Sequence, residues 1–137
     1  MKQQGFTLIE LLIVLAIIGI LAAIAIPTYR NYLINSQLTD GTNAMAAYRI
    51  KLEQWYQDNG NYGNAACGVA IPTSKYFTYT CTVQNAGQSY TITATGKSSN
   101  GLSAYTYTLD DAGNQVTTAY PNIAVPKPCW VIREGDC

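Results

Sequence analysis

The chain has 137 residues, of which 48% are hydrophobic and 12% charged, and its eight cationic and eight anionic side chains cancel at pH 7. This length accommodates one modest globular domain, and the neutral charge gives no indication of a nucleic acid or an acidic surface as an obligatory partner. Histidine is absent, which removes the commonest general base and metal ligand and argues against most hydrolase and metalloenzyme functions.

A long apolar run follows the first few residues. It extends from Phe6 to Ile26 and is interrupted by Thr7 and by the carboxylate of Glu10. At about 1.5 Å per residue, a helix of this length spans roughly 30 Å, the thickness of a bilayer's hydrocarbon core. The run is therefore predicted to cross a membrane. A carboxylate inside hydrocarbon costs on the order of 2.5 to 3.5 kcal/mol, so Glu10 needs a compensating interaction.

Two familiar kinds of membrane-directed segment leave Glu10 unexplained. A cleaved secretory signal would end at the small residues Ala23-Ile24-Ala25, just before Pro27. Its apolar region would be unusually long, however, and an acid near its start is out of place. An ordinary uncleaved anchor carries the same unfavourable carboxylate.

A cut between Gly5 and Phe6 would supply the missing partner. It creates an α-amino group four residues before Glu10 and removes Lys2 with the leader. The new amine then lies one helical turn from Glu10 of its own chain, or meets the Glu10 of a neighbouring helix shifted along a bundle axis. Such a pair would also set the stagger between subunits.

At the residues GFTLIELLIV, from Gly5 to Val14, the chain resembles the type IV pilins. The similarity combines a short basic leader, the glycine, the phenylalanine, the acid and the apolar run. It implies that a prepilin peptidase cuts after Gly5 and N-methylates Phe6. It also implies an assembly role for Thr7 and Glu10, in which Glu10 pairs with the N-terminus of a neighbouring subunit.

Gly19 and Pro27 are weak points of the predicted stem helix. Glycine costs about 1 kcal/mol relative to alanine in a helix, and proline removes one backbone hydrogen bond. Both residues are also common in membrane-spanning helices, so simple tolerance explains them equally well. The resemblance implies a use for them, because similar pilins lose helical structure between the matching positions when they pack into a fibre.

Beyond Pro27 the helical pattern continues with one apolar face. Its members recur in steps of three and four, which predicts that they form the core: Leu38, Gly41, Met45, Tyr48, Leu52 and Trp55. The polar residues between them make this half of the helix amphipathic, so it should pack on a sheet. Asn59-Gly60-Asn61 is expected to end the helix.

The remainder of the chain has the alternation of an antiparallel sheet. Four strands are predicted, at residues 76–83, 89–95, 104–109 and 115–119, with turns at 85–87, 98–101 and 110–114. One helix followed by a sheet indicates an α+β fold. The resemblance implies the pilin fold, a long N-terminal helix whose outer half packs on a four-stranded antiparallel sheet.

Four cysteines, Cys67, Cys81, Cys129 and Cys137, are expected to form two disulfides, because an even count behind a membrane-directed segment fits an oxidising compartment. Three pairings are possible, and Cys67 with Cys81 and Cys129 with Cys137 are favoured because each closes a short loop. The Pro-rich tail from residue 120 is expected to depend on such a link to stay in place. Its last nine residues resemble the minor pilins grouped with PilE and the DNA-uptake pilin ComP.

Other chemistry is sparse. The sequence Asp110-Asp111-Ala112-Gly113-Asn114 offers oxygen ligands for calcium, but an acidic hairpin turn is the preferred interpretation, and no metal or cofactor is predicted. Four cations would form a DNA-binding stripe if the fold brought them together, although a solvated surface is the simpler reading: Lys75, Lys97, Lys127 and Arg133. No phosphate loop, nucleophile elbow or catalytic carboxylate pair is recognisable, so an enzyme is not predicted.

The sequence therefore predicts a structural protein with a leader at 1–5, a transmembrane and fibre-core helix at 6–27 and a globular pilin domain at 28–137. The resemblance implies storage in the bacterial inner membrane, then assembly with other pilin subunits into an extracellular pilus used in adhesion, twitching motility or DNA uptake. Expected partners are the prepilin peptidase, the pilus assembly machinery and the membrane. The alternatives are a ComP-like minor pilin that receives DNA and a pseudopilin of a type II secretion machine.

Overall fold

We describe a computed structural model of residues 5–137; residues 1–4, which hold most of the expected leader, lie outside the described residues. The chain divides into two compact units, one ending at Ile34 and the other extending from Asn35 to Cys137. The second unit therefore begins seven residues beyond the start of the domain expected at residue 28. The domain boundary given by packing, at residue 35, therefore differs from the one at residue 28 that the change of polarity indicated.

A single helix, α1, extends from Leu8 to Asn59. Pro27 lies inside it and contributes no N–H, while the hydroxyl of Thr28 donates a hydrogen bond to the carbonyl of Ile24 at 2.9 Å. The helix ends where Gly60 takes a positive φ of 71°, with its N–H bonded to the carbonyl of Tyr56. The predicted helix end is confirmed.

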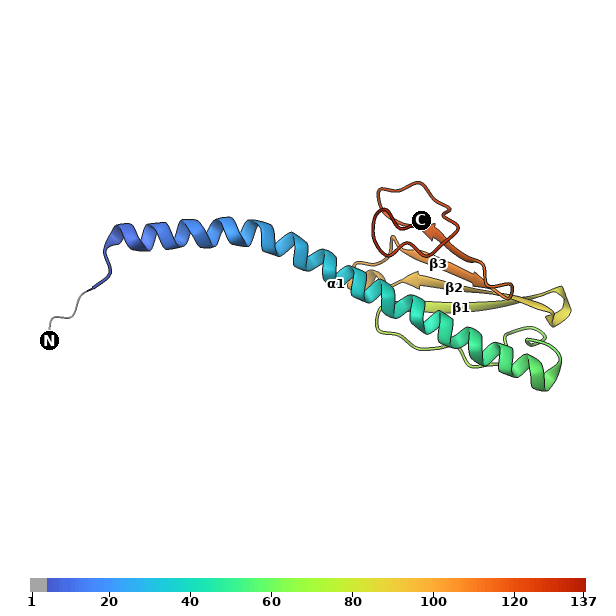
Figure 1. The fold of residues 1–137 in the computed structure, drawn as a ribbon. Helices are drawn as coiled ribbons and strands as arrows, with labels where there is room; N and C mark the ends of the chain where they lie inside the picture. Colours follow the sequence, from blue (N-terminus) through green and yellow to red (C-terminus); the bar gives the residue numbers. More distant parts are fainter. Residues whose placement is uncertain (1–4) are drawn as a thin grey trace. The chain divides into compact units, whose positions relative to one another are not determined.

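Four antiparallel strands follow: β1 (Phe77–Gln84), β2 (Ser89–Gly96), β3 (Thr106–Asp110) and β4 (Gln115–Ala119). They pair in chain order, and β1, β2 and β3 are labelled side by side in Figure 1. Phe77 is opposite Gly96 and Thr95 is opposite Thr106, so the start of β1, the end of β2 and the start of β3 lie at one end of the sheet. The predicted α+β fold with a four-stranded meander is confirmed.

The core lies between the sheet and the part of α1 beyond Asn35. The helix contributes Leu38, Met45, Tyr48 and Leu52, and the sheet contributes Phe77, Tyr79, Tyr90, Ile92, Ala94, Tyr107 and Leu109. Two hydroxyls on the sheet also donate to the helix: Tyr79 to the carbonyl of Gly41 at 3.1 Å, and Tyr90 to the carboxylate of Glu53 at 3.1 Å. The predicted packing of the sheet on the outer half of the helix is confirmed.

The predicted apolar stripe is wrong at one position. Trp55 is 36% exposed, whereas the four large apolar residues before it on the stripe are 0–2% exposed. Its indole lies against Gly68, in the loop between α1 and β1, at the place where a side chain on that glycine would sit. Periodicity correctly placed Trp55 on the inner face of the helix, but a loop rather than the sheet covers it there.

Gly41 is the point of closest approach between α1 and the sheet. A methyl group at this position would meet the ring of Phe77, which is buried at 1% exposure. Gly41→Ala is therefore expected to lower the free energy of unfolding by about 1 kcal/mol, since overpacking costs about 2 kcal/mol and the gain in helix propensity returns about 1.

Urea unfolding of the full chain in detergent, followed by circular dichroism, measures this difference. Gln54→Ala, at an exposed position on the same helix and with little change in helix propensity, is the control and should leave the midpoint nearly unchanged. In a Phe77→Leu background the penalty of Gly41→Ala should shrink, because the smaller side chain frees space. An unchanged or higher midpoint for Gly41→Ala alone would contradict the proposed contact.

Candidate functional sites

The start of α1 is a closed hydrogen-bonded cap. The backbone N–H and the hydroxyl of Thr7 both donate to Oε2 of Glu10, at 2.9 and 2.7 Å, and the N–H of Glu10 donates to the hydroxyl of Thr7 at 3.3 Å. This reciprocal arrangement is a capping box, which satisfies backbone donors that a helix start leaves free. Glu10 therefore has local donors before any second chain arrives.

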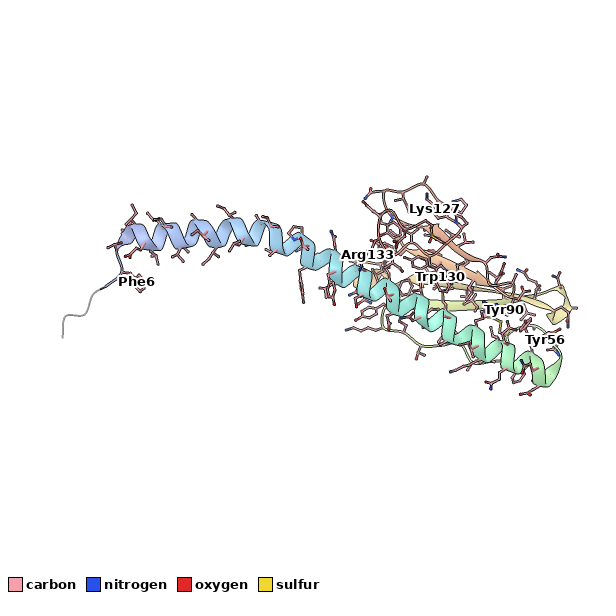
Figure 2. The ribbon with its side chains drawn as sticks, viewed as in Figure 1. Phe6, Tyr56, Tyr90, Lys127, Trp130 and Arg133 are labelled. Carbon is pink, nitrogen blue, oxygen red and sulfur yellow. A yellow bond between two sulfur atoms is a disulfide. The ribbon has the colours of Figure 1, made fainter. Side chains whose placement is uncertain are left out.

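Gly5 and Phe6 lie just ahead of this cap, outside the helix. Phe6 is 91% exposed, and a side chain at Gly5 would meet no atom of the described residues within 4 Å. Figure 2 shows Phe6 at the beginning of the ribbon's helical part. The peptide bond between the two residues thus lies in an open, non-helical segment directly before the helix.

The stem helix is continuous through Gly19 and Pro27. A methyl group on Gly19 would meet no atom within 4 Å, so no contact within residues 5–137 explains the glycine. The first part of α1 is long and apolar enough to cross a membrane, and its apolar window contains no buried residue. These properties leave the whole surface of the stem free to contact lipid or other stems.

The two disulfides join Cys67 to Cys81 and Cys129 to Cys137. The first ties the loop after α1 to the middle of β1, opposite Ile92 of β2. The second closes the last nine residues into a ring. These are the two pairings that the sequence favoured because each closes a short loop.

The C-terminal tail is attached to the sheet by more than its disulfide, which corrects the expectation that the link alone holds it. Thr117 in β4 is fully buried: its hydroxyl donates to the carbonyl of Cys129 at 2.7 Å and accepts from the N–H of Val131 at 2.9 Å. The hydroxyl of Tyr107 donates to the carbonyl of Val131, and the indole N–H of Trp130 donates to the carbonyl of Thr108. Sequence patterning marks Thr117 only as a strand residue and does not indicate this role.

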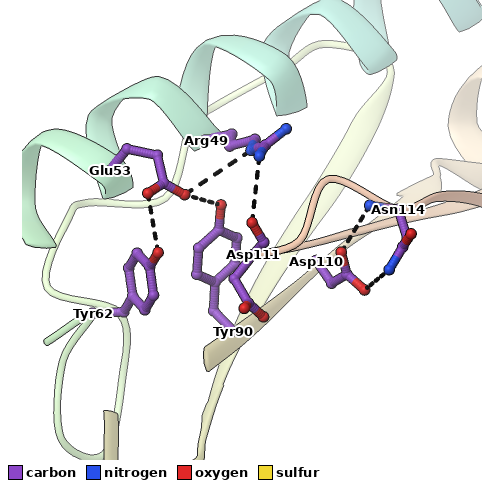
Figure 3. Close-up of polar contacts among 7 residues, drawn as sticks. All are labelled: Arg49, Glu53, Tyr62, Tyr90, Asp110, Asp111 and Asn114. Carbon is purple, nitrogen blue, oxygen red and sulfur yellow. Dashed lines mark hydrogen bonds and ion pairs between the residues drawn. The ribbon is translucent and has the colours of Figure 1, made fainter. Parts of the chain in front are cut away.

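Glu53 joins two segments to α1, its neighbour Arg49 joins a third, and Glu53 was not singled out by the sequence. Its two carboxylate oxygens accept hydrogen bonds from the hydroxyls of Tyr62, in the loop after α1, and Tyr90, in β2, at 3.0 and 3.1 Å. Arg49 lies 4.0 Å from the same carboxylate and donates to the carbonyl of Asp111 in the turn between β3 and β4. Figure 3 shows these contacts around Glu53.

In the acidic turn at Asp110–Asn114, the carboxylate oxygens of Asp110 accept hydrogen bonds from within the turn. Both oxygens of Asp110 accept hydrogen bonds from Asn114, one from the backbone N–H and one from the side-chain amide, each at 2.8 Å (Figure 3). The carbonyl of Asp111 is taken by Arg49. A hairpin turn closed by an Asp side chain accounts for this sequence.

Two of the four candidate DNA contacts lie together at one end of the sheet. The ammonium of Lys97 donates to the carbonyl of Ser74 at 2.7 Å, and the N–H of Lys97 bonds to the carbonyl of Tyr76. The ammonium of Lys75 lies 5.5 Å from the centre of the Tyr76 ring. Lys75, Tyr76 and Lys97 therefore form one basic and aromatic cluster where β1 begins and β2 ends.

Arg133 is connected to the same sheet end through contacts of Tyr105 and Tyr120. Tyr105 accepts the N–H of Gly96 on its carbonyl, its ring packs edge-on against Tyr120 at 5.0 Å, and the hydroxyl of Tyr120 donates to the carbonyl of Ile132. Lys127 instead pairs by its backbone with Thr117 in β4. Figure 2 shows Lys127 and Arg133 on the C-terminal segment, well away from Tyr56 and Tyr90.

Acidic groups accompany these cations. The negative charge of Glu134 acts on Tyr105 and Tyr120, whose pKa values are raised first by burial and then by neighbouring charges. The carboxylate of Asp136 accepts the N–H groups of Arg133 and Ile132, and these bonds lower its pKa. The field at this end of the sheet is therefore mixed rather than purely positive.

Comparison with known proteins identifies families for both parts of the chain. Residues 1–26 match the family model of the prokaryotic N-terminal methylation motif, and residues 27–109 match that of the type IV minor pilin ComP, DNA uptake sequence receptor. The fimbrial protein EcpC of Eikenella corrodens is 40% identical over 117 residues, covering 82% of this chain and 76% of that protein. The type IV major fimbrial protein FimA of Dichelobacter nodosus is 40% identical over 122 residues, covering 89% and 74%.

Two solved structures share the fold. A type IV pilin from Shewanella oneidensis aligns with a TM-score of 0.51 at 21% identity, over 71% of this chain and 97% of that one. The non-core minor pilin PilV of Neisseria meningitidis aligns with a TM-score of 0.54 at 17% identity, over 70% and 96%.

The contacts of Tyr62 predict alkaline instability. Burial, followed by the hydrogen bond to Glu53 and its charge, raises the pKa of Tyr62 to about 12, while an unfolded tyrosine titrates near 10.0. Between these values the unfolded chain has lost a proton that the folded chain keeps. The free energy of unfolding should therefore fall as the pH rises from about 10 toward 12. The same sign holds for Tyr90, whose pKa is also raised by burial and by Glu53.

Urea unfolding at a series of pH values, followed by circular dichroism, tests this dependence. Tyr62→Phe cannot ionise, so its stability should be lower at pH 8 but should decline less steeply above pH 10. Thr80→Ala, which removes an exposed hydroxyl from β1, should keep the wild-type slope. A Tyr62→Phe chain with an unchanged slope would show that Tyr62 ionises normally in the folded protein.

Proposed function

Because the chain belongs to the type IV pilin family, we propose that it is cut after Gly5, methylated on the nitrogen of Phe6 and polymerised with other pilin subunits through its stem. Members of this family are anchored in the inner membrane and then assembled into an extracellular pilus. The proposed parts are a leader at 1–5, a stem at 6–27 and a globular domain at 28–137. The observation that carries the proposal is the Thr7–Glu10 cap directly behind an open Gly5–Phe6 bond.

The exposed stem explains both locations of the protein. The large apolar side chains from Phe6 to Ile26 are at least half exposed in the isolated chain, a surface that requires a nonaqueous environment. Lipid supplies that environment before assembly, and the stems of neighbouring subunits supply it in the fibre. Helix association then relies on close packing, because lipid tails are as apolar as the side chains they cover.

The cap suggests how Glu10 is accommodated both in the membrane-stored subunit and in the assembled fibre. In the stored protein, Thr7 provides two donors to Oε2 of the carboxylate, which lowers the cost of placing an acid in the apolar run. Cleavage after Gly5 adds a charged amine on Phe6. In a dry fibre core an unpaired charge is strongly unfavourable, so the amine and the carboxylate of adjacent subunits are expected to pair.

Glu10→Gln separates the charge from the cap. Glutamine at this position preserves the capping box, since its amide oxygen accepts the same hydrogen bonds. Membrane insertion and cleavage after Gly5 should therefore continue, while incorporation into filaments drops at least tenfold because the ion pair is lost. Intact-mass measurement reports processing and methylation, and comparison of membrane with sheared-filament fractions reports assembly.

Thr7→Val is the matched control for this experiment. It removes the hydroxyl from the cap but leaves the charge on Glu10, so it should reduce incorporation much less than Glu10→Gln does. Normal incorporation of Glu10→Gln would refute the pairing mechanism. A mature chain beginning near Ile26 would instead identify the segment as a secretory signal.

A second proposed function is contact with DNA. It is favoured by the cluster of Lys75, Tyr76 and Lys97, and by the match of residues 27–109 to the family of the DNA uptake sequence receptor ComP. With Arg133 nearby, about three phosphates would be contacted, which gives an expected slope of log K against log salt of about −2.7. Such a small slope goes with weak binding at physiological salt.

Binding of fluorescent duplex DNA to the full chain in detergent, measured by anisotropy across a salt series, tests this second function. The double variant Lys75→Glu/Lys97→Glu should abolish the binding seen at low salt. Arg30→Glu/Lys51→Glu, which makes the same change in net charge at exposed positions of α1, should affect it little. Equal losses in the two variants would indicate that only net charge matters and would remove the DNA-receptor function from this cluster.

A further inference from the structure

A short section of α1 belongs neither to the apolar run nor to the sheet unit. The run ends at Ile26 and the second compact unit begins at Asn35. Between them lie two large aromatic side chains, Tyr29 and Tyr32, which are 63% and 67% exposed, and the cation Arg30. Neither the sheet contacts nor the proposed assembly mechanism uses these residues.

The two tyrosines lie on one side of the helix. They are three residues apart, which places them one turn apart on the same face. Together with Leu21, Ile24, Ala25 and Thr28 they line one shallow, mainly apolar hollow on the surface of α1. The aromatic pair therefore continues the lipid-facing surface of the stem past its last aliphatic residue.

We propose that Tyr29, Arg30 and Tyr32 form an interfacial collar that fixes the depth of the stored protein in the bilayer. The partner is the lipid headgroup layer of the leaflet opposite the N-terminus. The tyrosine rings lie among the glycerol and carbonyl groups, and the guanidinium of Arg30 binds lipid phosphates. The collar depends on membrane storage of the protein and not on how the filament assembles.

The dimensions of the helix place the collar at the level of the lipid headgroups. If the run from Phe6 to Ile26 fills the hydrocarbon core, Tyr29 lies about 4.5 Å and Tyr32 about 9 Å beyond its edge, at 1.5 Å per residue. The headgroup layer on each side is about 5 to 7 Å thick. Side chains on a helix lean toward its N-terminus, so both rings point back toward the membrane.

The chemistry of the three side chains fits the same layer. Tyrosine has an apolar ring and a polar hydroxyl, and it is enriched where membrane and water meet. Arginine extends its charge from a long apolar stem and forms paired hydrogen bonds with phosphate oxygens. In the apolar run of a second copy the one acid is Glu10, which the proposed assembly mechanism assigns to the amine of Phe6, so the run offers no acid of its own for the guanidinium of Arg30.

Depth-dependent fluorescence quenching tests the collar directly. The full chain is placed in vesicles of phosphatidylethanolamine and phosphatidylglycerol with bromine atoms at shallow or deep positions on the acyl chains. Tryptophan at the collar, in Tyr29→Trp and in Tyr32→Trp, should be quenched most by shallow bromines. Leu21→Trp, a probe within the run, should be quenched most by deep ones. The unsubstituted chain gives the background of Trp55 and Trp130.

The same measurement identifies the outcomes that overturn the proposal. Collar probes quenched by neither lipid would place the segment in water, and probes quenched most by deep bromines would place it in hydrocarbon. These results concern vesicles in which no filament forms. They are therefore independent of whether the pairing of Glu10 with Phe6 is correct.

A second variant asks whether the rings set the depth. With Ile24→Trp as the reporter, Tyr29→Ala/Tyr32→Ala should change the ratio of shallow to deep quenching at least twofold, because the helix is free to slide. Asn31→Ala, at an exposed position between the two tyrosines, should leave the ratio unchanged. An unchanged ratio in the double variant overturns the collar. If the same double variant is also lost from sheared-filament fractions, the tyrosines pack against a second copy instead.

Discussion

The acid near the start of an apolar helix is the constraint on which the stem depends. A carboxylate in hydrocarbon is tolerated only when donors surround it, and Thr7 provides two of them from a position three residues earlier. The cap keeps the helix start ordered while leaving the preceding Gly5–Phe6 bond outside the helix. The proposed roles in storage, processing and assembly therefore fall within six residues of the chain, from Gly5 to Glu10.

The sheet unit depends on a second carboxylate in a similar way. Glu53 holds Tyr62 and Tyr90 by their hydroxyls, so one side chain on α1 positions both the loop that follows the helix and the second strand. Its contact with Arg49 is more than a third exposed to solvent and contributes little by itself. Because the two tyrosine rings are buried, their hydroxyls need these acceptors, and the carboxylate is retained inside an otherwise aromatic cluster.

Long periodic elements were the part of the fold that local sequence could predict. The steps of three and four along α1 and the alternation with threonine along the strands follow from geometry that repeats within each element. Trp55 marks the limit of this reasoning, because its place on the stripe is periodic but its exposure depends on a loop around Gly68 that has no period. Thr117 shows a second limit: nothing in its strand pattern indicates that its hydroxyl donates one hydrogen bond to the tail and accepts another from it.

The sequence by itself determined the family, the membrane-spanning stem and the order of helix and strands, because these properties reside in contiguous residues: the motif at Gly5 to Glu10, the apolar run and the alternating segments. Only the tertiary structure decided which distant groups share a site. It placed Lys75 and Lys97 at one end of the sheet but Lys127 beside β4, and it gathered Tyr62 and Tyr90 around Glu53. Such groupings arise from strand register and loop path, which are set by the packing of the whole chain rather than by any local pattern.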